Sequence, residues 1–372
     1  MRTLRSLIYG EVLSAVAFVT LGFAALFFFF DFVEELRWIG NGSDSPLGAY
    51  NVSHALLYVS LLQPSHLYEL LPITVLIGTI YVLARMAQSS EFTILRTSGL
   101  GPWRALRTLL WLGLAFAVLT FAMGDYVAPY ADKNAQLFKA QFKGRLSTGA
   151  TGAWLKEKQP GREFAVNVAA ITAQGQLQDV RIYEFDDQGY LRGVMRASVV
   201  RFAPEDGGWR LQGVERQAFE VRQADRGNIA LQSHEDWLWK TEISPAMVTT
   251  ALLKPDRMST LDLFRYIRHL DANAQSAQIY EIEFWRKVFY PLSCLVMVVL
   301  ALPFAYLHFR RAGITAYVFT GVMIGISFFL LNNVFGYLGN LSLWWPWLTA
   351  AAPGLIYSLL SLGAFTWLVL RQ

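Results

Sequence analysis

The residues that most often carry catalysis or bind metals are few in this sequence and stand apart from one another. The five histidines are scattered, and no two have the spacing of a metal-binding pair. The chain contains no GxxxxGKS/T phosphate-binding loop, no HExxH and no GxSxG. The single cysteine, Cys294, lies in an apolar run, which favours a buried side chain over a redox role. We therefore expect no catalytic residue, no metal site and no cofactor in this chain, and any ATP must be hydrolysed by a partner.

The most informative polar segment is residues 85–104. Ser90 and Glu91 are typical of a short helix start, Phe92 would then lie on one face of that helix, and Gly99 would end it. Arg96 follows within the same stretch. Two interpretations are open: a short amphipathic helix that docks an ATPase subunit, or a solvated loop whose arginines set the membrane topology.

The elements that must position this segment are membrane spans. The chain is 54% hydrophobic and only 16% charged, and residues 312–370 contain no Asp, Glu, Lys or Arg. A membrane-spanning helix needs about 20 apolar residues. We predict six spans, at residues 12–30, 67–84, 108–124, 288–309, 314–335 and 345–370.

The basic residues indicate the orientation of these spans. The N-terminus, the C-terminus and the loops after the second and fourth spans are rich in arginine, whereas the segment after the first span is acidic. The positive-inside rule then places both termini in the cytoplasm and the large insertion between spans three and four in the periplasm. Net charge is only +4, without basic clusters interleaved with aromatic residues, so nucleic acid is not an expected partner.

The sequence of the insertion predicts β structure. Short β-prone runs at residues 166–168, 180–183, 194–202 and 209–211 are separated by turn signals at 186–189 and 204–208. This pattern favours a sandwich or jelly roll. After Ser259 the periodicity becomes helical. The predicted fold is a membrane α-helical protein with an inserted, jelly-roll-like all-β domain. Its parts are residues 1–125 (spans one to three), 126–258 (β domain) and 259–372 (linking helix and spans four to six).

Several segments together resemble the LptF/LptG family of lipopolysaccharide export permeases, and the details are most similar to its LptG branch. They are LPITVLIG at 71–78, LARMAQSSE at 83–91, RTSG at 96–99, GDYVAP at 124–129, FWRKVFYPLS at 284–293 and NNVFG at 332–336. The similarity runs through the whole chain in order.

The resemblance implies function and partners beyond what spacing shows. Members pair as an LptF–LptG heterodimer above two copies of the ATPase LptB, and their periplasmic jelly rolls join the bridge proteins LptC and LptA. The assembly extracts lipopolysaccharide from the inner membrane and passes it towards the outer membrane. The segment with Ser90, Glu91, Phe92 and Arg96 corresponds to the coupling helix of the family.

A substrate path along the first and fifth spans is also implied. Some relatives have a lysine at the outer end of span one that is thought to meet lipid A phosphates, but here Asp31 occupies that place. Arg37 is the only basic residue between spans one and two and is our candidate for a phosphate contact. The candidate apolar path residues are Phe27, Phe30, Tyr317 and Phe328. Lipid-facing or helix-packing positions are the alternative for each aromatic residue, and an ion pair with Glu34 is the alternative for Arg37.

Three other functions were weighed. A permease-like subunit of another envelope ABC system, for lipoprotein release or force transmission, usually has four spans, so six spans argue against it. A membrane-embedded enzyme for envelope lipids needs clustered acidic, histidine or serine residues that are not found here. A structural scaffold is the third. Co-purification with an ATPase that lipopolysaccharide stimulates separates export from the other three.

Overall fold

The structure is a computed structural model that describes residues 2–41, 48–89, 91–97, 101–143, 152–172, 175–222, 226–251, 254–306, 313–342 and 344–370. The chain forms two compact units. The first consists of Met1–Glu34, Val59–Ala131 and Gln278–Gln372, and the second of Glu35–Tyr58 and Asp132–Ala277.

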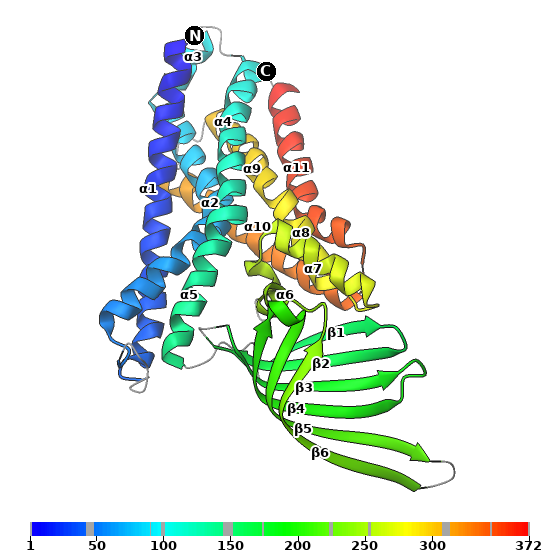
Figure 1. Cartoon of the computed structure of the whole chain (residues 1–372). Helices are drawn as coiled ribbons and strands as arrows, with labels where there is room; N and C mark the ends of the chain where they lie inside the picture. Colours follow the sequence, from blue (N-terminus) through cyan, green and yellow to red (C-terminus); the bar gives the residue numbers. More distant parts are fainter. Residues whose placement is uncertain are drawn as a thin grey trace. The chain divides into compact units, whose positions relative to one another are not determined.

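The first unit is a bundle of long apolar helices (Figure 1). Its elements are α1 (Arg2–Glu35), α2 (Val52–Gln88), α3 (Glu91–Thr97), α4 (Pro102–Ala122), the π-helical turn η2 (Met123–Val127), the start of α5 (Ala128–Lys143), α8 (Gln278–Phe289), η5 (Tyr290–Leu292), α9 (Ser293–Ala301), η6 (Leu302–Ala305), α10 (Ile314–Ser342) and α11 (Pro346–Leu370). Among the described residues, six helical runs are long and apolar enough to span a membrane. The six predicted spans are confirmed.

The fourth span begins earlier than its apolar run. It covers Gln278–Ala305, whereas the sequence pattern places its start at Val288. The intervening residues include Arg286 and Lys287, whose charges lower the local hydropathy, so the apolar run starts only after them. Both side chains bond to groups inside the bundle, which is why charged residues are tolerated there. Residues 307–309, the predicted end of this span, lie outside the described residues.

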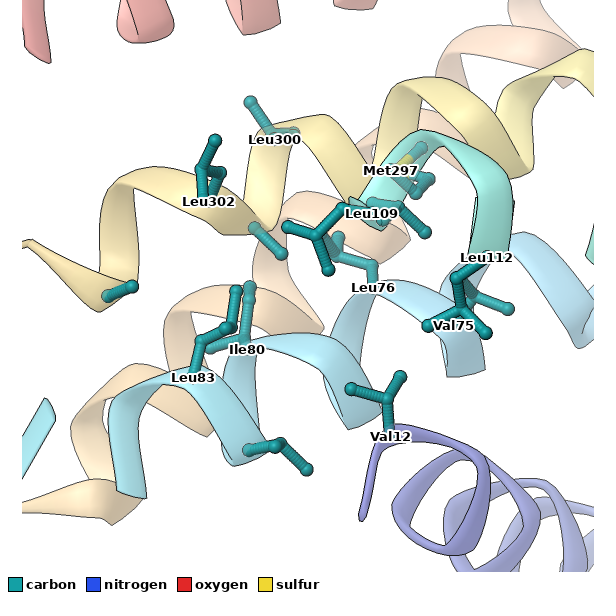
Figure 2. Packing of buried hydrophobic residues seen from close by; sticks show 14 of the residues in the cluster. Val12, Val75, Leu76, Ile80, Leu83, Leu109, Leu112, Met297, Leu300 and Leu302 are labelled. Carbon is teal, nitrogen blue, oxygen red and sulfur yellow. The ribbon is translucent and has the colours of Figure 1, made fainter. Parts of the chain in front are cut away.

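The core of the bundle is built around α2. Figure 2 shows Leu76 and Ile80 of α2 beneath Met297 of α9 and Leu109 of α4, with Val12 of α1 reaching α2 from the other side. Lipid tails are as apolar as these side chains, so close van der Waals packing, rather than removal from water, holds such helices together.

Small residues allow the helices to approach closely. A Cβ on Gly78 of α2 would lie 2.7 Å from Cγ2 and 2.8 Å from the backbone nitrogen of Val16 in α1. On α10, Gly321 and Gly325 face Ile80 and Ile73 of α2, and a Cβ on either would come within 3.0 Å of the isoleucine side chain. This four-residue spacing of glycines is a common membrane packing motif, and it sets how α10 lies against α2.

The second unit is built on one antiparallel sheet of six strands in sequence order (Figure 1). The strands are β1 (Ala153–Gln159), β2 (Arg162–Ile171), β3 (Leu177–Asp186), β4 (Leu191–Ala203), β5 (Gly208–Arg222) and β6 (Arg226–Lys240). The predicted runs fall within β2, β3, β4 and β5, and both predicted turns lie between strands. The sequence pattern missed β1 and β6 because charged residues interrupt their apolar positions. The last turns of α5, ending at Lys143, precede the sheet, so its strands begin later than the predicted boundary at residue 126.

A crease runs across the sheet and bends it. Residue pairing is interrupted at Asp179 of β3, Ser198 of β4 and Gly213 of β5, which lie beside one another on adjacent strands. Asp179 and Gly213 have positive φ values of 49° and 63°. On either side of this line the buried face changes from odd-numbered to even-numbered residues along β3 and β5. Interruptions of this kind increase the local twist, and the sheet folds over its apolar face.

Buried polar contacts then close one corner of the folded sheet. The Glu157 carboxylate of β1, 5% exposed, accepts hydrogen bonds from the Thr241 hydroxyl and from the Glu242 N–H at 2.8 Å. The indole N–H of Trp209 donates to the carbonyl of Ile243 at 2.7 Å. Edge strand β1 is thereby tied to the segment that follows β6. The prediction of an inserted all-β domain is confirmed. The described strands form one sheet in the order of a meander, because each strand pairs with its neighbours in sequence.

The described part of this unit also contains η1 (Leu36–Trp38), the start of α2, most of α5, η3 (Pro204–Asp206), α6 (Pro245–Ala251), η4 (Pro255–Arg257) and α7 (Thr260–Ala272). The helix predicted after Ser259 is α7, and the Ser259 hydroxyl accepts a hydrogen bond from the Asp262 N–H at its start. This side chain caps the helix as expected for serine. Helix α7 ends at Ala272, and α8 begins at Gln278, so α7 and the fourth span are separate helices.

Candidate functional site

The predicted coupling segment forms a short helix, α3. Figure 1 shows α3 at the same end of the bundle as the two chain termini. Glu91 is exposed in its first turn, and Ile94, 62% exposed, also faces outwards. Phe92 is only 3% exposed, and its ring packs edge-on against Tyr306 with centroids 5.0 Å apart. Phe92 therefore anchors α3 to the bundle, while Glu91 and Ile94 are available to another protein.

Two predicted residues of this segment, Ser90 and Arg96, are not described to the same extent. Ser90 lies outside the described residues, as does the side chain of Arg96. Nearby, Arg85 at the end of α2 donates to the carboxylate of Glu11 in α1 at 2.5 Å. This ion pair joins the two helices close to the start of α3.

Along α1, the two predicted aromatic residues of the substrate path differ in their surroundings. Phe30 is exposed. Phe27 is partly buried and stacks on His66 of α2, with ring centroids 4.8 Å apart. Nε2 of His66 lies 2.8 Å from Oδ2 of Asp31. Asp31, which stands where some relatives have a lysine, thus takes part in a contact between α1 and α2.

On α10, the two predicted path residues are buried in the bundle. Tyr317 packs edge-on against Phe304 at 6.0 Å between centroids. Phe328 packs against Tyr357 of α11 at 5.1 Å and against Tyr290 at 6.3 Å. Both are core positions in this conformation. The exposed apolar side chains of α10 are others, among them Phe319, Met323, Ile326, Leu330 and Leu341.

Arg37 lies in η1, within the second unit, and is exposed. Among the described residues of this unit it makes no ion pair. A second cation of the unit, Lys139, is occupied: its Nζ lies 2.6 Å from the Glu35 carboxylate and 4.4 Å from the ring centroid of Tyr58. Burial and a hydrogen bond to Glu35 raise the pKa of neighbouring Tyr50. This enclosed cluster leaves Arg37 available for an external anion.

The apolar helices are covered unequally. The span of α2 is 83% buried, but that of α1 is 11% and that of α10 is 22% buried. A helix that is apolar all round and buried on one side must face lipid or another membrane helix. The exposed faces of α1 and α10 are therefore open to lipid or to another membrane helix.

Charged residues of α8 make contacts that the sequence pattern does not predict. Arg286 and Lys287 reach carbonyl groups on two other helices, at Asn332 and Gly124 respectively. Two adjacent cations beside an apolar run were the available signal. Among the described residues, no three His, Cys, Asp or Glu side chains gather closely enough to hold a metal ion.

Six membrane helices, a short helix with an outward carboxylate at the terminal end of the bundle and an inserted β domain define a multi-pass membrane protein of the permease class. The family model described as "Lipopolysaccharide export system permease LptF/LptG" matches residues 6–370. The chain belongs to this family, and it is a multi-pass inner-membrane protein.

Curated relatives agree with this assignment. The chain is 29% identical to the lipopolysaccharide export system permease protein LptG of Escherichia coli K12. The 343 aligned residues cover 92% of this chain and 90% of the relative. It is 27% identical to the protein of the same name from Haemophilus influenzae. The 372 aligned residues cover 100% of this chain and 99% of the relative. Both relatives belong to the branch that the sequence motifs predict.

Proposed function

We propose that this chain is a transmembrane permease subunit of an ATP-driven exporter that extracts lipopolysaccharide from the inner membrane and delivers it to a periplasmic protein bridge. The observation that carries the proposal is the family match from residue 6 to residue 370, which includes all six spans and the β domain. In this proposal a separate subunit hydrolyses ATP, because the sequence has no phosphate-binding loop. The proposal includes no cofactor for this chain.

In this proposal the partners occupy different surfaces. An LptF-like permease and the lipid substrate meet the exposed faces of α1 and α10, and an LptB-like ATPase dimer binds at α3. LptC-like and LptA-like proteins continue the path from the β domain. Both termini lie in the cytoplasm and the β domain in the periplasm, since the arginine-rich loops then face inwards.

Reconstitution tests the function directly. The chain, co-expressed with its neighbouring subunits and placed in proteoliposomes, should show ATP hydrolysis stimulated by lipopolysaccharide and ATP-dependent release of lipopolysaccharide to an added acceptor. The chain purified alone should leave ATP intact. Equal stimulation by phospholipid without any release of lipopolysaccharide would contradict export and favour another envelope ABC system.

The coupling role of α3 rests on Glu91. Its carboxylate is exposed at the first turn of a helix that Phe92 fixes to the bundle. Charge reversal by Glu91→Lys should weaken ATPase binding about tenfold or more, because like charges across an interface cost several kcal/mol. Glu205→Lys, the same change in an exposed turn of the β domain, is the matched control and should bind the ATPase normally. Pull-down of the ATPase at equal strength for both variants would refute this role.

The anion-binding role of Arg37 rests on its exposure and lack of an ion pair among the described residues of its unit. Guanidinium binds phosphate through paired hydrogen bonds. Arg37→Glu should therefore lower lipopolysaccharide-stimulated ATPase activity more than Arg37→Lys does. A photocrosslinker at Phe27 or Phe30 should capture lipopolysaccharide. Normal transport by Arg37→Glu, with crosslinks only to phospholipid, would place the path along the partner subunit.

A further inference from the structure

Three segments that are far apart in the sequence meet at α8. They are η2, which α8 contacts at Gly124, α8 itself, and α10, which α8 contacts at Asn332. We propose that Arg286 and Lys287 of α8 form a clamp, the α8 clamp, which couples the position of α10 to that of the third span during transport. The proposal rests on the proposed function, because it assumes that α10 moves as lipopolysaccharide is exported.

Lys287 makes the contact to the third span. It is 6% exposed, and its Nζ donates to the carbonyl oxygen of Gly124 at 2.8 Å and lies 5.5 Å from the ring centroid of Tyr68. Gly124 belongs to the π-helical turn η2, where the regular hydrogen-bond ladder of the helix is locally changed. A Cβ at Gly124 would collide with the Tyr68 ring, so glycine is required for this approach. The ammonium group stabilises the turn by bonding to its carbonyl.

Arg286 makes the contact to α10. One guanidinium nitrogen, Nη2, donates to the carbonyl oxygen of Asn332 at 2.8 Å, and the other, Nη1, donates to the Glu283 carboxylate at 2.8 Å. A Cβ at Gly336, one turn further along α10, would lie 2.8 Å from Nη2. Gly336 therefore leaves the space in which the guanidinium reaches the backbone of α10.

The placement of the two cations explains why one helix can hold two neighbours. Consecutive side chains on an α-helix point about 100° apart, and Arg286 and Lys287 bond to different helices. Cations inside a membrane bundle are costly, and apolar side chains of similar length would pack there without that cost. Charged hydrogen bonds to two backbone carbonyls instead specify the position of each partner helix. Movement of α10 must either break the Asn332 contact or carry α8 and the third span with it.

A double-mutant cycle tests whether the two residues act as one link. Arg286→Met, Lys287→Met and the double variant are compared in the complete exporter by the amount of lipopolysaccharide released per ATP hydrolysed. Each single variant should lower this ratio about fivefold or more, the usual range for coupling between sites. The release ratio of the double variant should be no lower than that of either single variant, because losing one contact already uncouples α10 from the third span. Arg286→Lys and Lys287→Arg should each restore part of the ratio.

Gln278→Met is the matched control. Its side-chain amide donates to the carbonyls of Gly339 and Trp344 at 3.2 and 2.7 Å, so it joins α8 to the end of α10 without reaching the third span. This variant should keep the release ratio of the unmodified exporter. The proposal would be overturned if the fold-losses in the release ratio of the two single variants multiplied in the double variant. An equal loss in Gln278→Met would also overturn it, because both results would show independent packing contacts.

A distance measurement separates the clamp from the proposed function. Spin labels at Leu119 of α4 and Leu341 of α10, both exposed, report the spacing of spans three and five in a Cys294→Ala background. Arg286→Met should broaden this distance distribution, and Gln278→Met should not. Unchanged distributions in Arg286→Met and Lys287→Met would refute the clamp. If the unmodified exporter itself releases no lipopolysaccharide, the proposed function fails instead.

Discussion

Gly78 gives the sharpest test of how α1 is held. The span of α1 is only 11% buried, and one of its closest approaches to α2 is at Val16 opposite Gly78. The backbone nitrogen and Cα of Val16 would lie 2.8 and 2.9 Å from a Cβ on Gly78. A backbone atom cannot rotate away as a side chain can. Gly78→Ala must therefore displace α1 from α2.

The magnitude follows from two opposing terms. Overpacking of this kind costs about 1–3 kcal/mol. Replacing glycine by alanine within a helix contributes about 0.5–1 kcal/mol in the opposite direction. The expected net loss is about 0–2.5 kcal/mol. Gly22→Ala on α1 is the matched control, because no heavy atom lies within 4 Å of its ideal Cβ. This control should be neutral or slightly stabilising.

Two assays on the purified exporter in nanodiscs check the prediction. Thermal unfolding should begin at lower temperature in Gly78→Ala than in Gly22→Ala, by about 2–4 °C per kcal/mol. Cysteines at Thr20 and Thr74, whose hydroxyls are hydrogen-bonded at 3.0 Å across the same interface, should form a disulfide less readily in Gly78→Ala. Equal unfolding temperatures and equal disulfide yields in the two variants would show that Gly78 does not set the distance between α1 and α2.

Three further predictions concern the second unit. Glu157→Ala should destabilise the domain by about 1–3 kcal/mol, because the Thr241 hydroxyl and a backbone N–H lose their acceptor; proteolysis at an unchanged rate would contradict this. Burial lowers the pKa of His269, so the folded state binds fewer protons than the unfolded state and stability should fall as pH drops through the ordinary histidine range near 6.5. His269→Phe should flatten that part of the pH profile, and an unaltered profile would exclude His269 as its source. Cysteines at Ser198 and Gly207 should react with an impermeant maleimide from the periplasm, and protection of both would overturn the orientation.

The membrane architecture could be predicted from sequence because a bilayer imposes a length and a composition on each span. Six apolar runs of the required length became six helices. The fifth continues past its predicted end at residue 335 as far as Ser342, and the sixth begins at Pro346. Local chemistry was also sufficient for the cap at Ser259 and the turn at residues 204–208, since neighbours along the chain determine both. The outward carboxylate of Glu91 follows from the same kind of local pattern.

Long-range packing decided the remainder. Phe92 was expected to contribute to docking, yet only the tertiary structure shows that Tyr306 covers it. Tyr317 and Phe328 look the same in sequence as the exposed aromatic residues of α10, because a helix that is apolar all round has no pattern to distinguish its buried face. The closure of the sheet at Glu157 joins residues more than 80 positions apart. The meeting of Arg286 and Lys287 with Asn332 and Gly124 likewise depends on which helices are neighbours, which a sequence of uniformly apolar spans does not specify.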